Sequence, residues 1–333
     1  MKNEELSNLL VEWYYKNARK MPWRVIGGAH PNPYEVWISE IMLQQTTVQT
    51  VREYFVRWIE RFPDVYSLAQ ADVEEVMLYW QGLGYYTRAR KIHECAKILV
   101  EKYDGKLPFD RNELLKLPGI GPYSASSIAA FGFNLPETVV DGNVIRVIAR
   151  LYGIEEAVSK DEIFKLAEPL THQEKPADYA SAIMDLGAGV CTPQNPTCLL
   201  CPWQKSCVAF QKNLVDKIPQ IKKMEKKNVT GFVHLIQNEK NEFYIQKRTE
   251  KGLLHGLYEF PWTREEIPMF QADWIEKKGQ VTHVFTHFNL RLKPLYLKAD
   301  KIPLETGFFV PKKDFDKYPF STLMKKVIKL ISD

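Results

Sequence analysis

Four closely spaced cysteines carry the clearest chemical signal in this sequence. They follow the pattern Cys191-x6-Cys198-x2-Cys201-x5-Cys207. Thiols so close together are poorly placed to cross-link a long chain with disulfides, but they suit a 4Fe-4S cluster or a tetrahedral zinc ion. Structural zinc usually uses two short Cys-x-x-Cys pairs, and here one such pair is present. The spacing therefore favours an iron-sulfur cluster over zinc or a bare cysteine-rich loop.

A turn rich in proline and glycine lies upstream of the cysteines. The segment Leu117-Pro118-Gly119-Ile120-Gly121-Pro122 predicts the end of one helix, a tight turn and the start of another. Gly119 and Gly121 permit positive φ angles and a close approach of the backbone to a ligand. Pro122 suits the first turn of a helix whose free N–H groups attract phosphate. Alone, the segment fits an ordinary turn between helices as well as it fits a DNA contact.

The order of these parts resembles a known family. A hairpin, then Asp141-Gly142-Asn143, then the cysteine loop is the order seen in the endonuclease III and MutY superfamily of helix-hairpin-helix DNA glycosylases. The resemblance implies that the cysteines hold one 4Fe-4S cluster as cofactor. It also implies that the cluster orders a loop near the DNA backbone and takes no part in hydrolysis.

Two acidic residues stand in contrasting local environments. Glu40 shares a predicted helix face with Trp37 and Leu43, and apolar neighbours raise the pKa of a carboxylic acid. Asp141 precedes a predicted helix, whose N-terminal end favours the ionised form. Each residue alone also fits a solvated helix position or a turn. The resemblance to MutY implies excision of adenine, which needs an acid to protonate the base at N7 and a carboxylate to stabilise a cationic sugar, so we expect Glu40 as the general acid and Asp141 as the counter-ion.

Two further motifs extend the resemblance over most of the chain. Residues 37–46, Trp-x-Ser-Glu-x-Met-Leu-Gln-Gln-Thr, look like the MutY signature, and residues 82–90 look like a second motif of that family. The resemblance implies that Gln45 and Tyr85 wedge into the duplex beside a flipped nucleotide, offsetting part of the cost of unstacking it.

The hairpin residue Tyr123 separates the close relatives. Enzymes of the endonuclease III type carry a lysine there, and its amine forms the Schiff base that starts strand cleavage. A tyrosine cannot form that bond, so we expect base excision without an efficient lyase step. By the resemblance, Tyr123 and Asn143 position Asp141 and the attacking water.

The resemblance further implies that Trp23 and Arg24 line the adenine pocket. Two departures from the family pattern fall near that pocket. Residues 25–32 form a longer segment than the family usually has, and Ser181 stands where relatives commonly carry Gln or Glu. We therefore expect one contact to adenine to differ.

The C-terminal third carries a second recognition motif. Phe285, Thr286 and His287 lie on a β-type run at residues 281–297 and resemble the Phe-Ser-His loop with which MutY enzymes read 8-oxoguanine opposite adenine. Threonine keeps the hydroxyl of serine and adds a methyl group. Residues 256–261 are similar to part of the Nudix fold. No acidic Nudix box follows them, so we expect no metal-dependent pyrophosphate hydrolysis.

The elements that would position these residues fall into two domains. Apolar spacings of three and four predict helices up to about residue 210, and a lysine-rich linker follows. Strand-like runs at 229–237 and 243–248 come next, and residues 320–331 predict a closing helix. We expect an all-α helix-hairpin-helix glycosylase domain with a 4Fe-4S loop at 1–210, a linker at 211–227 and an α+β Nudix-like domain at 228–333.

Composition limits the remaining possibilities. Lys and Arg exceed Asp and Glu by 45 to 41, which allows a nucleic-acid partner without arguing for one. The N-terminus has acidic residues where a secretion signal needs basic ones, and no apolar stretch approaches bilayer length. We expect a cytoplasmic monomer with no membrane contact, which associates with the nucleoid through DNA. Its expected partner is double-stranded DNA with adenine opposite 8-oxoguanine or guanine.

Two other functions remain as alternatives. One is a glycosylase of the same fold with another mismatch target or a weak lyase step. The other is a non-catalytic iron-sulfur protein that binds DNA. Tyr123 and the Phe285 to His287 segment argue against the first, and Glu40 with Asp141 argues against the second.

Overall fold

The computed structural model describes residues 2–27, 31–220 and 225–331. Contacts divide the chain into two compact units, one of residues 1–70 and 91–222 and one of residues 71–90 and 223–333. Residues 71–90, which the sequence assigned to the N-terminal domain, pack with the C-terminal segment in this division. Parts of the expected linker, at 221–224, and of the long 25–32 segment, at 28–30, lie outside the described residues.

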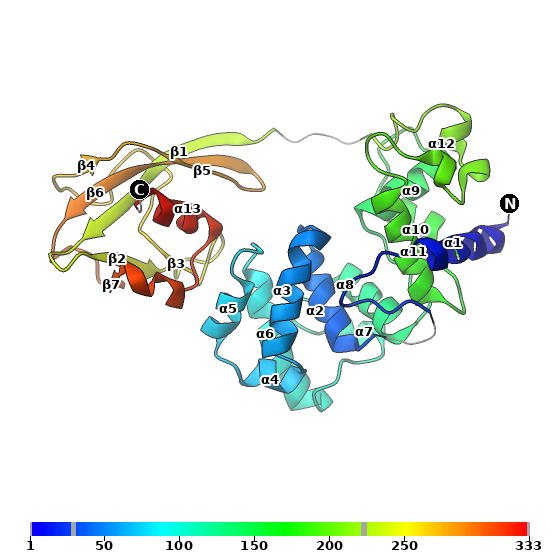
Figure 1. Ribbon diagram of the computed structural model, residues 1–333, viewed down its shortest axis with the longest axis horizontal. Helices are drawn as coiled ribbons and strands as arrows, with labels where there is room; N and C mark the ends of the chain where they lie inside the picture. The colour runs from blue at the N-terminus through cyan, green and yellow to red at the C-terminus, as the bar shows by residue number, and fades with distance from the viewer. Residues whose placement is uncertain (1, 28–30, 221–224, 332–333) are drawn as a thin grey trace. The chain divides into compact units, whose positions relative to one another are not determined.

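The first unit is helical, as the sequence predicted. Its central packing joins α1 (Asn3–Asn17), α9 (Gly142–Tyr152) and α11 (Pro176–Gly189), whose apolar faces share one buried cluster. Figure 1 shows its other helices, which are α2 (Pro33–Leu43), α3 (Val48–Arg61), α4 (Val65–Gln70), α7 (Arg111–Leu115), α8 (Pro122–Ser127), α10 (Lys160–Ala167) and α12 (Val208–Gln211). Helix α6 (Thr87–Tyr103) contributes residues to both units.

Local signals set the ends of the helices that carry the site. Helix α2 starts after Asn32, whose side chain accepts a hydrogen bond from the Tyr34 N–H, and Pro33 occupies its first turn. Helix α9 starts after Asp141 and ends at Gly153, which has φ of 68°. Helix α8 continues into a π-helical turn, η1 (Ile128–Gly132).

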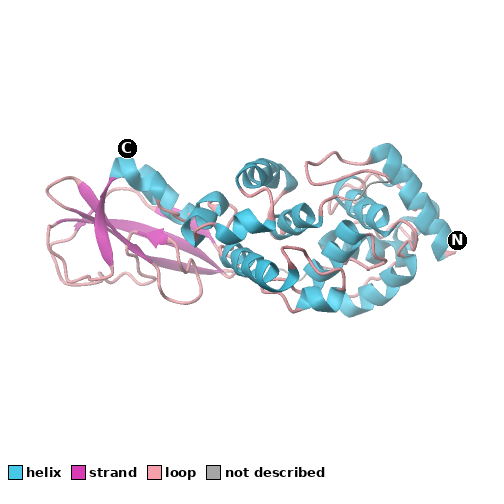
Figure 2. Cartoon of the chain, turned by 90° about the horizontal axis from the view of Figure 1, so that it is seen from below, coloured by secondary structure: helices cyan, strands magenta, loops and turns pink. Residues whose placement is uncertain are grey.

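The second unit holds one mixed sheet, and every strand that the structure describes belongs to it (Figure 2). The strand order is β3-β2-β1-β6-β4, with β5 paired to β6 and β7 paired to β2. Strands β1 and β6 are parallel and the other pairs are antiparallel. The strands are β1 (Lys227–Gln237), β2 (Glu242–Lys247), β3 (Tyr258–Glu259), β4 (Ile275–Glu276), β5 (Val281–Val284), β6 (Phe288–Lys298) and β7 (Gly307–Pro311).

Helical segments complete the second unit. Helix α13 (Thr322–Leu330) places apolar side chains in the core beside the sheet. Helix α5 (Val73–Trp80) and the turn after it belong to the same unit, where Glu74 pairs with Lys247 at 2.7 Å and the Gln81 side-chain amide donates to the Phe320 carbonyl at 3.0 Å.

The run at residues 281–297 is not one strand, contrary to the sequence-based expectation. Strand β5 ends at Val284 and β6 begins at Phe288, so Phe285, Thr286 and His287 form the turn of an antiparallel hairpin. The Phe285 N–H donates to the Phe288 carbonyl at 2.8 Å and closes this turn. A turn presents side chains at the end of the sheet, which a continuous strand would not do.

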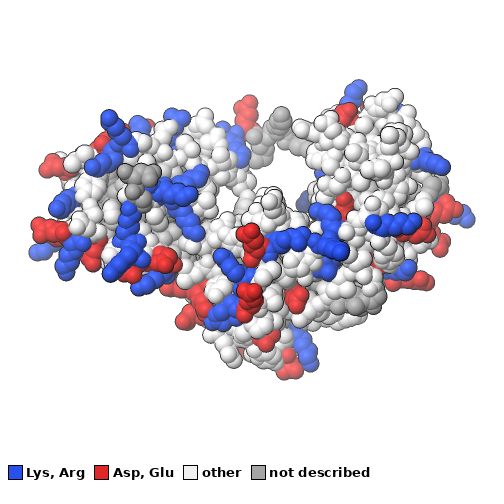
Figure 3. Space-filling model, viewed as in Figure 1, with Lys and Arg blue, Asp and Glu red and all other residues white. Residues whose placement is uncertain are grey.

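On the face shown in Figure 3, positive and negative side chains are interspersed over each unit. Within the described residues, no helix combines the length and the apolar character that a membrane span requires.

Candidate active site

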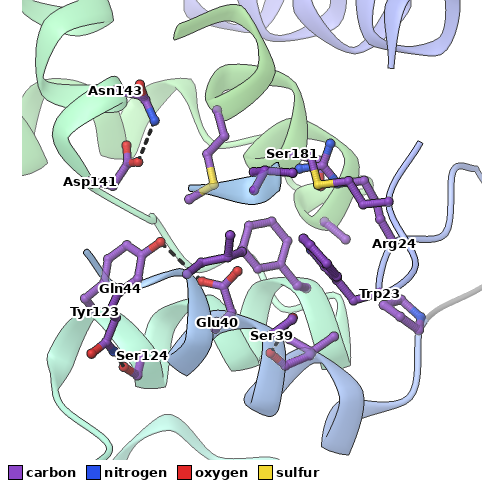
Figure 4. Close-up of a pocket in the computed structure, with 18 of the residues that line it drawn as sticks. Trp23, Arg24, Ser39, Glu40, Gln44, Tyr123, Ser124, Asp141, Asn143 and Ser181 are labelled. Atoms are coloured by element: carbon purple, nitrogen blue, oxygen red, sulfur yellow. Dashed lines mark hydrogen bonds between the residues drawn. The ribbon is translucent and has the colours of Figure 1, made fainter. Parts of the chain in front are cut away.

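A cavity of about 1010 Å³ opens in the helical unit. Its walls come from α2, the start of α8, the start of α9, one face of α11 and the loop before α2, so segments far apart in sequence meet there (Figure 4). A volume of this size accommodates a nucleotide-sized ligand. The cavity brings together the predicted residues Trp23, Arg24, Glu40, Gln45, Gly119, Gly121, Tyr123, Asp141 and Asn143, along with Ser181.

Glu40 is a buried acid on the cavity wall, with 7% of its surface exposed. Burial raises its pKa to about 7; the negative charge of Asp141 adds to the rise, and hydrogen bonds from Ser127 and Tyr123 and the charge of Arg24 oppose it. The Tyr123 hydroxyl lies 3.2 Å from Glu40 Oε2 and donates to it. Because a pKa near 7 leaves the group partly protonated at neutral pH, Glu40 can deliver a proton.

Asp141 is held in a different way, as the cap of α9. Its Oδ1 accepts the Val144 backbone N–H at 2.8 Å, and its Oδ2 accepts the Asn143 side-chain amide at 2.9 Å (Figure 4). Two donors and the helix N-terminus stabilise a negative charge on this carboxylate. The structure therefore pairs Asn143 with Asp141, whereas the Tyr123 hydroxyl donates to Glu40, a division of partners that the sequence did not indicate.

Asn143 is itself fixed by neighbours that sequence reasoning missed. Arg146 donates to Asn143 Oδ1 at 2.9 Å, to the Gly187 carbonyl at 2.6 Å and to the Cys191 carbonyl at 2.8 Å. A Cβ atom on Gly187 would lie 2.6 Å from the Cβ of Asn143, so a glycine allows α11 to approach α9 closely. These contacts connect the cap of α9 to the start of the cysteine loop.

The hairpin forms one rim of the cavity, and its two glycines differ. Gly119 has φ of 81°, and a Cβ there would lie 2.7 Å from Lys91 Cβ. Gly121 has φ of −90°, and a Cβ there would meet open space, with nothing beyond its chain neighbours within 4 Å. Gly121 therefore does not use the positive φ that a glycine permits, because the chain is already extended before Pro122. The Gln44 side-chain amide donates to Ser124 Oγ at 3.0 Å and ties α2 to this rim.

The residues expected to surround adenine also reach the cavity. Trp23 is buried, with its ring edge-on to Phe55 at 5.2 Å, and Arg24 lies beside Ser181 across the cavity from Asp141 (Figure 4). Gln45, the expected wedge residue, is exposed and has φ of 63°. A left-handed conformation is uncommon for glutamine, and such residues gather at functional sites.

Asp185 is a buried carboxylate that the sequence analysis did not single out. It is 2% exposed and accepts hydrogen bonds from Arg19 Nε at 2.8 Å and from Arg24 Nη1 at 2.8 Å. A signal was present, since Asp185 follows Ile183 and Met184 and precedes Leu186 on a helix with few polar residues. An acid in such a run needs a partner, but nothing local identifies which one.

Comparisons with known proteins agree with this geometry. An adenine DNA glycosylase of Buchnera aphidicola subsp. Schizaphis graminum (strain Sg) is 37% identical over 310 residues, which cover 87% of this chain and 86% of that protein. An adenine DNA glycosylase of Mus musculus is 32% identical over 400 residues, which cover 98% of this chain and 78% of that protein. The chain belongs to the adenine DNA glycosylase family.

Family models and solved structures cover the parts of this glycosylase. A model of the HhH-GPD superfamily of base excision DNA repair proteins matches residues 38–172, and a NUDIX domain model matches residues 232–330. A thermostable thymine-DNA glycosylase is 26% identical with a TM-score of 0.58, covering 63% of this chain and 97% of that one. An endonuclease III bound to DNA is 26% identical with a TM-score of 0.53, covering 64% and 99%. The chain is a base excision repair glycosylase with a Nudix-like C-terminal part.

The cysteine loop of the glycosylase packs at the edge of the helical core. Cys191, Cys201 and Cys207 contact the cluster formed by α1, α9 and α11. Burial raises the pKa of Cys207, and the charges of Cys191 and Cys198 add to the rise. Arg150 lies among them, with Nη1 3.4 Å from Cys191 Sγ.

Four cysteines in such a loop match the donor chemistry of an iron-sulfur cluster. Among the described residues, no group of three or more His, Cys, Asp or Glu side chains is placed to hold a metal ion. Four thiolates in one loop are a donor set that a 4Fe-4S cluster or a tetrahedral zinc ion can use.

The second unit of the glycosylase brings two expected DNA-contact residues together. The Tyr85 hydroxyl and Thr286 Oγ1 are 2.9 Å apart, and both residues line a second cavity of about 330 Å³ with His287 and Phe285. Tyr85 is 49% exposed and has φ of 48°. The Phe285 carbonyl accepts a hydrogen bond from Lys226 Nζ at 2.9 Å. The predicted wedge and the predicted reader of the opposite base thus share one surface.

Proposed function

We propose that this glycosylase hydrolyses the bond between adenine and deoxyribose in duplex DNA where adenine lies opposite 8-oxoguanine or guanine. The observation that carries the proposal is the pairing, in one cavity, of Glu40 as a buried acid with a pKa of about 7 and Asp141 as a hydrogen-bonded carboxylate. Excision of a base needs one group of each kind.

The geometry supports a sequence of steps without a cofactor in the chemistry. Protonated Glu40 gives its proton to adenine N7, the bond from N9 to C1′ breaks, and the electron pair leaves with the base. The sugar becomes cationic at C1′, where the carboxylate of Asp141 stabilises it. Water then adds to C1′ and gives a proton back to Glu40. Tyr123 orients Glu40, and Asn143 orients Asp141.

Glu40→Gln tests the acid. The variant should bind mismatched DNA as the native protein does but release no adenine in single-turnover assays, because a carboxamide cannot donate the proton. Glu35→Gln is a matched control, since Glu35 lies on the same helix outside the cavity. Native-rate turnover by Glu40→Gln would show that the acid is another group. Release of a different base from a panel of mismatches would favour the alternative target.

The absence of a lysine at position 123 supports a purely hydrolytic reaction. A lyase step needs an amine that attacks C1′, and the lysines that line the cavity are Lys160 and Lys175. Borohydride trapping on a duplex with an abasic site should yield no covalent adduct. A trapped adduct that disappears in Lys160→Gln or Lys175→Gln would establish the weak lyase alternative.

We further propose that the four cysteines bind one 4Fe-4S cluster. The cluster would hold the loop in its folded conformation and would take no part in base excision, because its ligands lie outside the cavity lining. The purified protein should contain iron and acid-labile sulfide and absorb visible light. Stoichiometric zinc in protein prepared without oxygen would contradict this assignment.

The turn at Phe285, Thr286 and His287 is our candidate for reading the base opposite adenine. Its hydroxyl is already hydrogen-bonded to Tyr85, which places both at the rim of the second cavity. Thr286→Ala should narrow the preference for 8-oxoguanine over guanine in excision rates, and Thr286→Ser, which keeps the hydroxyl, should retain that preference. Equal preference in all three proteins would remove this turn from recognition.

A further inference from the structure

The cavity wall opposite Asp141 carries two arginines that share one carboxylate. Asp185 on α11 accepts from Arg24 Nη1 at 2.8 Å through each oxygen, from the Arg19 backbone N–H at 2.9 Å and from Arg19 Nε at 2.8 Å. Arg19 and Arg24 both line the cavity. One carboxylate therefore holds two guanidinium groups that face the same space as Glu40.

Arg24 is the more enclosed of the two arginines. Its side chain is 11% exposed, against 38% for Arg19, and its guanidinium carbon lies 5.9 Å from the ring centroid of Tyr14. A guanidinium with so little access to water takes the carboxylates within its reach as partners. Asp185 is the carboxylate that Arg24 bonds, and Glu40 lines the same cavity, where the charge of Arg24 acts on it (Figure 4).

We propose that Asp185 is a positioning residue that holds Arg24 away from Glu40, and so keeps Glu40 free to carry the proton that excision needs. The inference rests on the proposed role of Glu40. If Arg24 paired with Glu40, an ion pair would favour the carboxylate and remove the general acid. Bonding to both Asp185 oxygens fixes Arg24 at the wall, where it can still contact a bound base.

The other groups that face Glu40 do not perform this task. Tyr123 and Ser127 on α8 donate to it, and Asp141 at the cap of α9 is negative and favours its protonation. Among the described groups that shift the pKa of Glu40, Arg24 is the cation. Its charge lowers that pKa, whereas burial raises it. The protonation of Glu40 should therefore respond to where Arg24 is held.

The test is a direct titration of Glu40 in the full protein. Its carboxylic-acid infrared band is assigned by the loss of that band in Glu40→Gln, and it is followed against pH in native protein, Asp185→Asn and Arg24→Met. Asp185→Asn should lower the titration midpoint by about one pH unit, because Arg24 gains access to Glu40. Arg24→Met should raise it. A purely structural disturbance would not move the midpoint in opposite directions.

A double variant keeps the inference testable if Asp185→Asn folds poorly, since removing one partner of a buried ion pair is strongly destabilising. When Arg24 is absent, adding Asp185→Asn should produce no downward movement, because Asp185 acts through Arg24. A downward movement in that background would show that Asp185 acts directly and would overturn the proposal. So would an unchanged midpoint in Asp185→Asn itself.

Asp161→Asn is a charge control. Asp161 is an exposed acid in the first turn of α10 and is not part of the cavity lining, so its loss should leave the Glu40 midpoint in place. In single-turnover excision, Asp185→Asn should lose about tenfold in rate near pH 8 and keep the native rate near pH 5. Because the infrared titration does not require adenine release, a failure of the proposed activity and a failure of this inference give different results.

Discussion

Replacing Glu40 by glutamine should stabilise the protein while it abolishes excision. The carboxyl group is buried in the native fold, where a charged form is costly, and its pKa is about 7. In the unfolded chain the same group has a value of about 4.5. Glutamine keeps the shape of the side chain and cannot ionise, so the variant avoids the cost of a buried charge.

The size and sign of the effect follow from this difference. The folded pKa is raised, so its contribution to stability is intact below about pH 4.5 and is lost as the pH rises through about 7. A change from 4.5 to about 7 corresponds to about 3 kcal/mol. Relative to Glu40→Gln, the free energy of unfolding of the native protein should therefore fall by about 1.4 kcal/mol for each pH unit between about 4.5 and 7, with little further change above pH 7.

Urea unfolding followed by helical circular dichroism measures this difference. Both proteins are unfolded between about pH 5 and pH 8.5, and the difference between their free energies of unfolding is plotted against pH. Glu53→Gln, which removes an exposed carboxylate from α3, controls for the loss of one negative charge. A difference between native and Glu40→Gln that is constant across the range would refute the reasoning, because only a titrating group gives a slope.

Three further outcomes follow from the same contacts. Gly119→Ala should lower the free energy of unfolding in urea by about 1–2 kcal/mol, since alanine disfavours the positive φ and its Cβ would contact Lys91. Gly121→Ala should leave that free energy nearly unchanged, and equal losses in the two variants would contradict the difference in backbone conformation. Arg146→Met should slow adenine release in single-turnover assays, because Asn143 loses the donor that fixes it, and an unchanged rate would show that Asp141 needs no such support. Gln44→Leu should lower the free energy of unfolding by about 1 kcal/mol, because Ser124 loses the hydrogen bond from the Gln44 amide. An unchanged free energy would mean that this hydrogen bond does not stabilise the fold.

Features encoded by neighbouring residues could be predicted from the sequence. The apolar face around Glu40, the position of Asp141 before its helix and the spacing of the cysteines each lie within a few positions, and periodicity alone located the helices and the first two strands of the sheet. The turn at Phe285 was missed because alternation continues across it, and a backbone hydrogen bond rather than a breaker residue closes it. Residue type permits a positive φ at both hairpin glycines and could not say that Gly119 adopts it while Gly121 does not.

Features that depend on distant partners could not be predicted in this way. Asp185 meets arginines more than 160 positions before it in the chain, and Arg146 meets the Cys191 carbonyl 45 positions after it. Tyr85 and Thr286 are 201 positions apart, and each was expected to touch DNA without any indication that they touch each other. Sequence spacing identifies residue types that can do chemistry, but it does not say which charge faces which.

That distinction matters most for the two carboxylates proposed to act on adenine. Asp141 receives its hydrogen bonds from its own helix, so a small local segment suffices to hold its carboxylate in place. Glu40 depends on the whole cavity, because burial by several helices favours the protonated form and Arg24 opposes it. Tuning of the acid is therefore a property of long-range packing. Substitutions on α11 and in the loop before α2 should change the pH dependence of excision even where they leave Glu40 and Asp141 untouched.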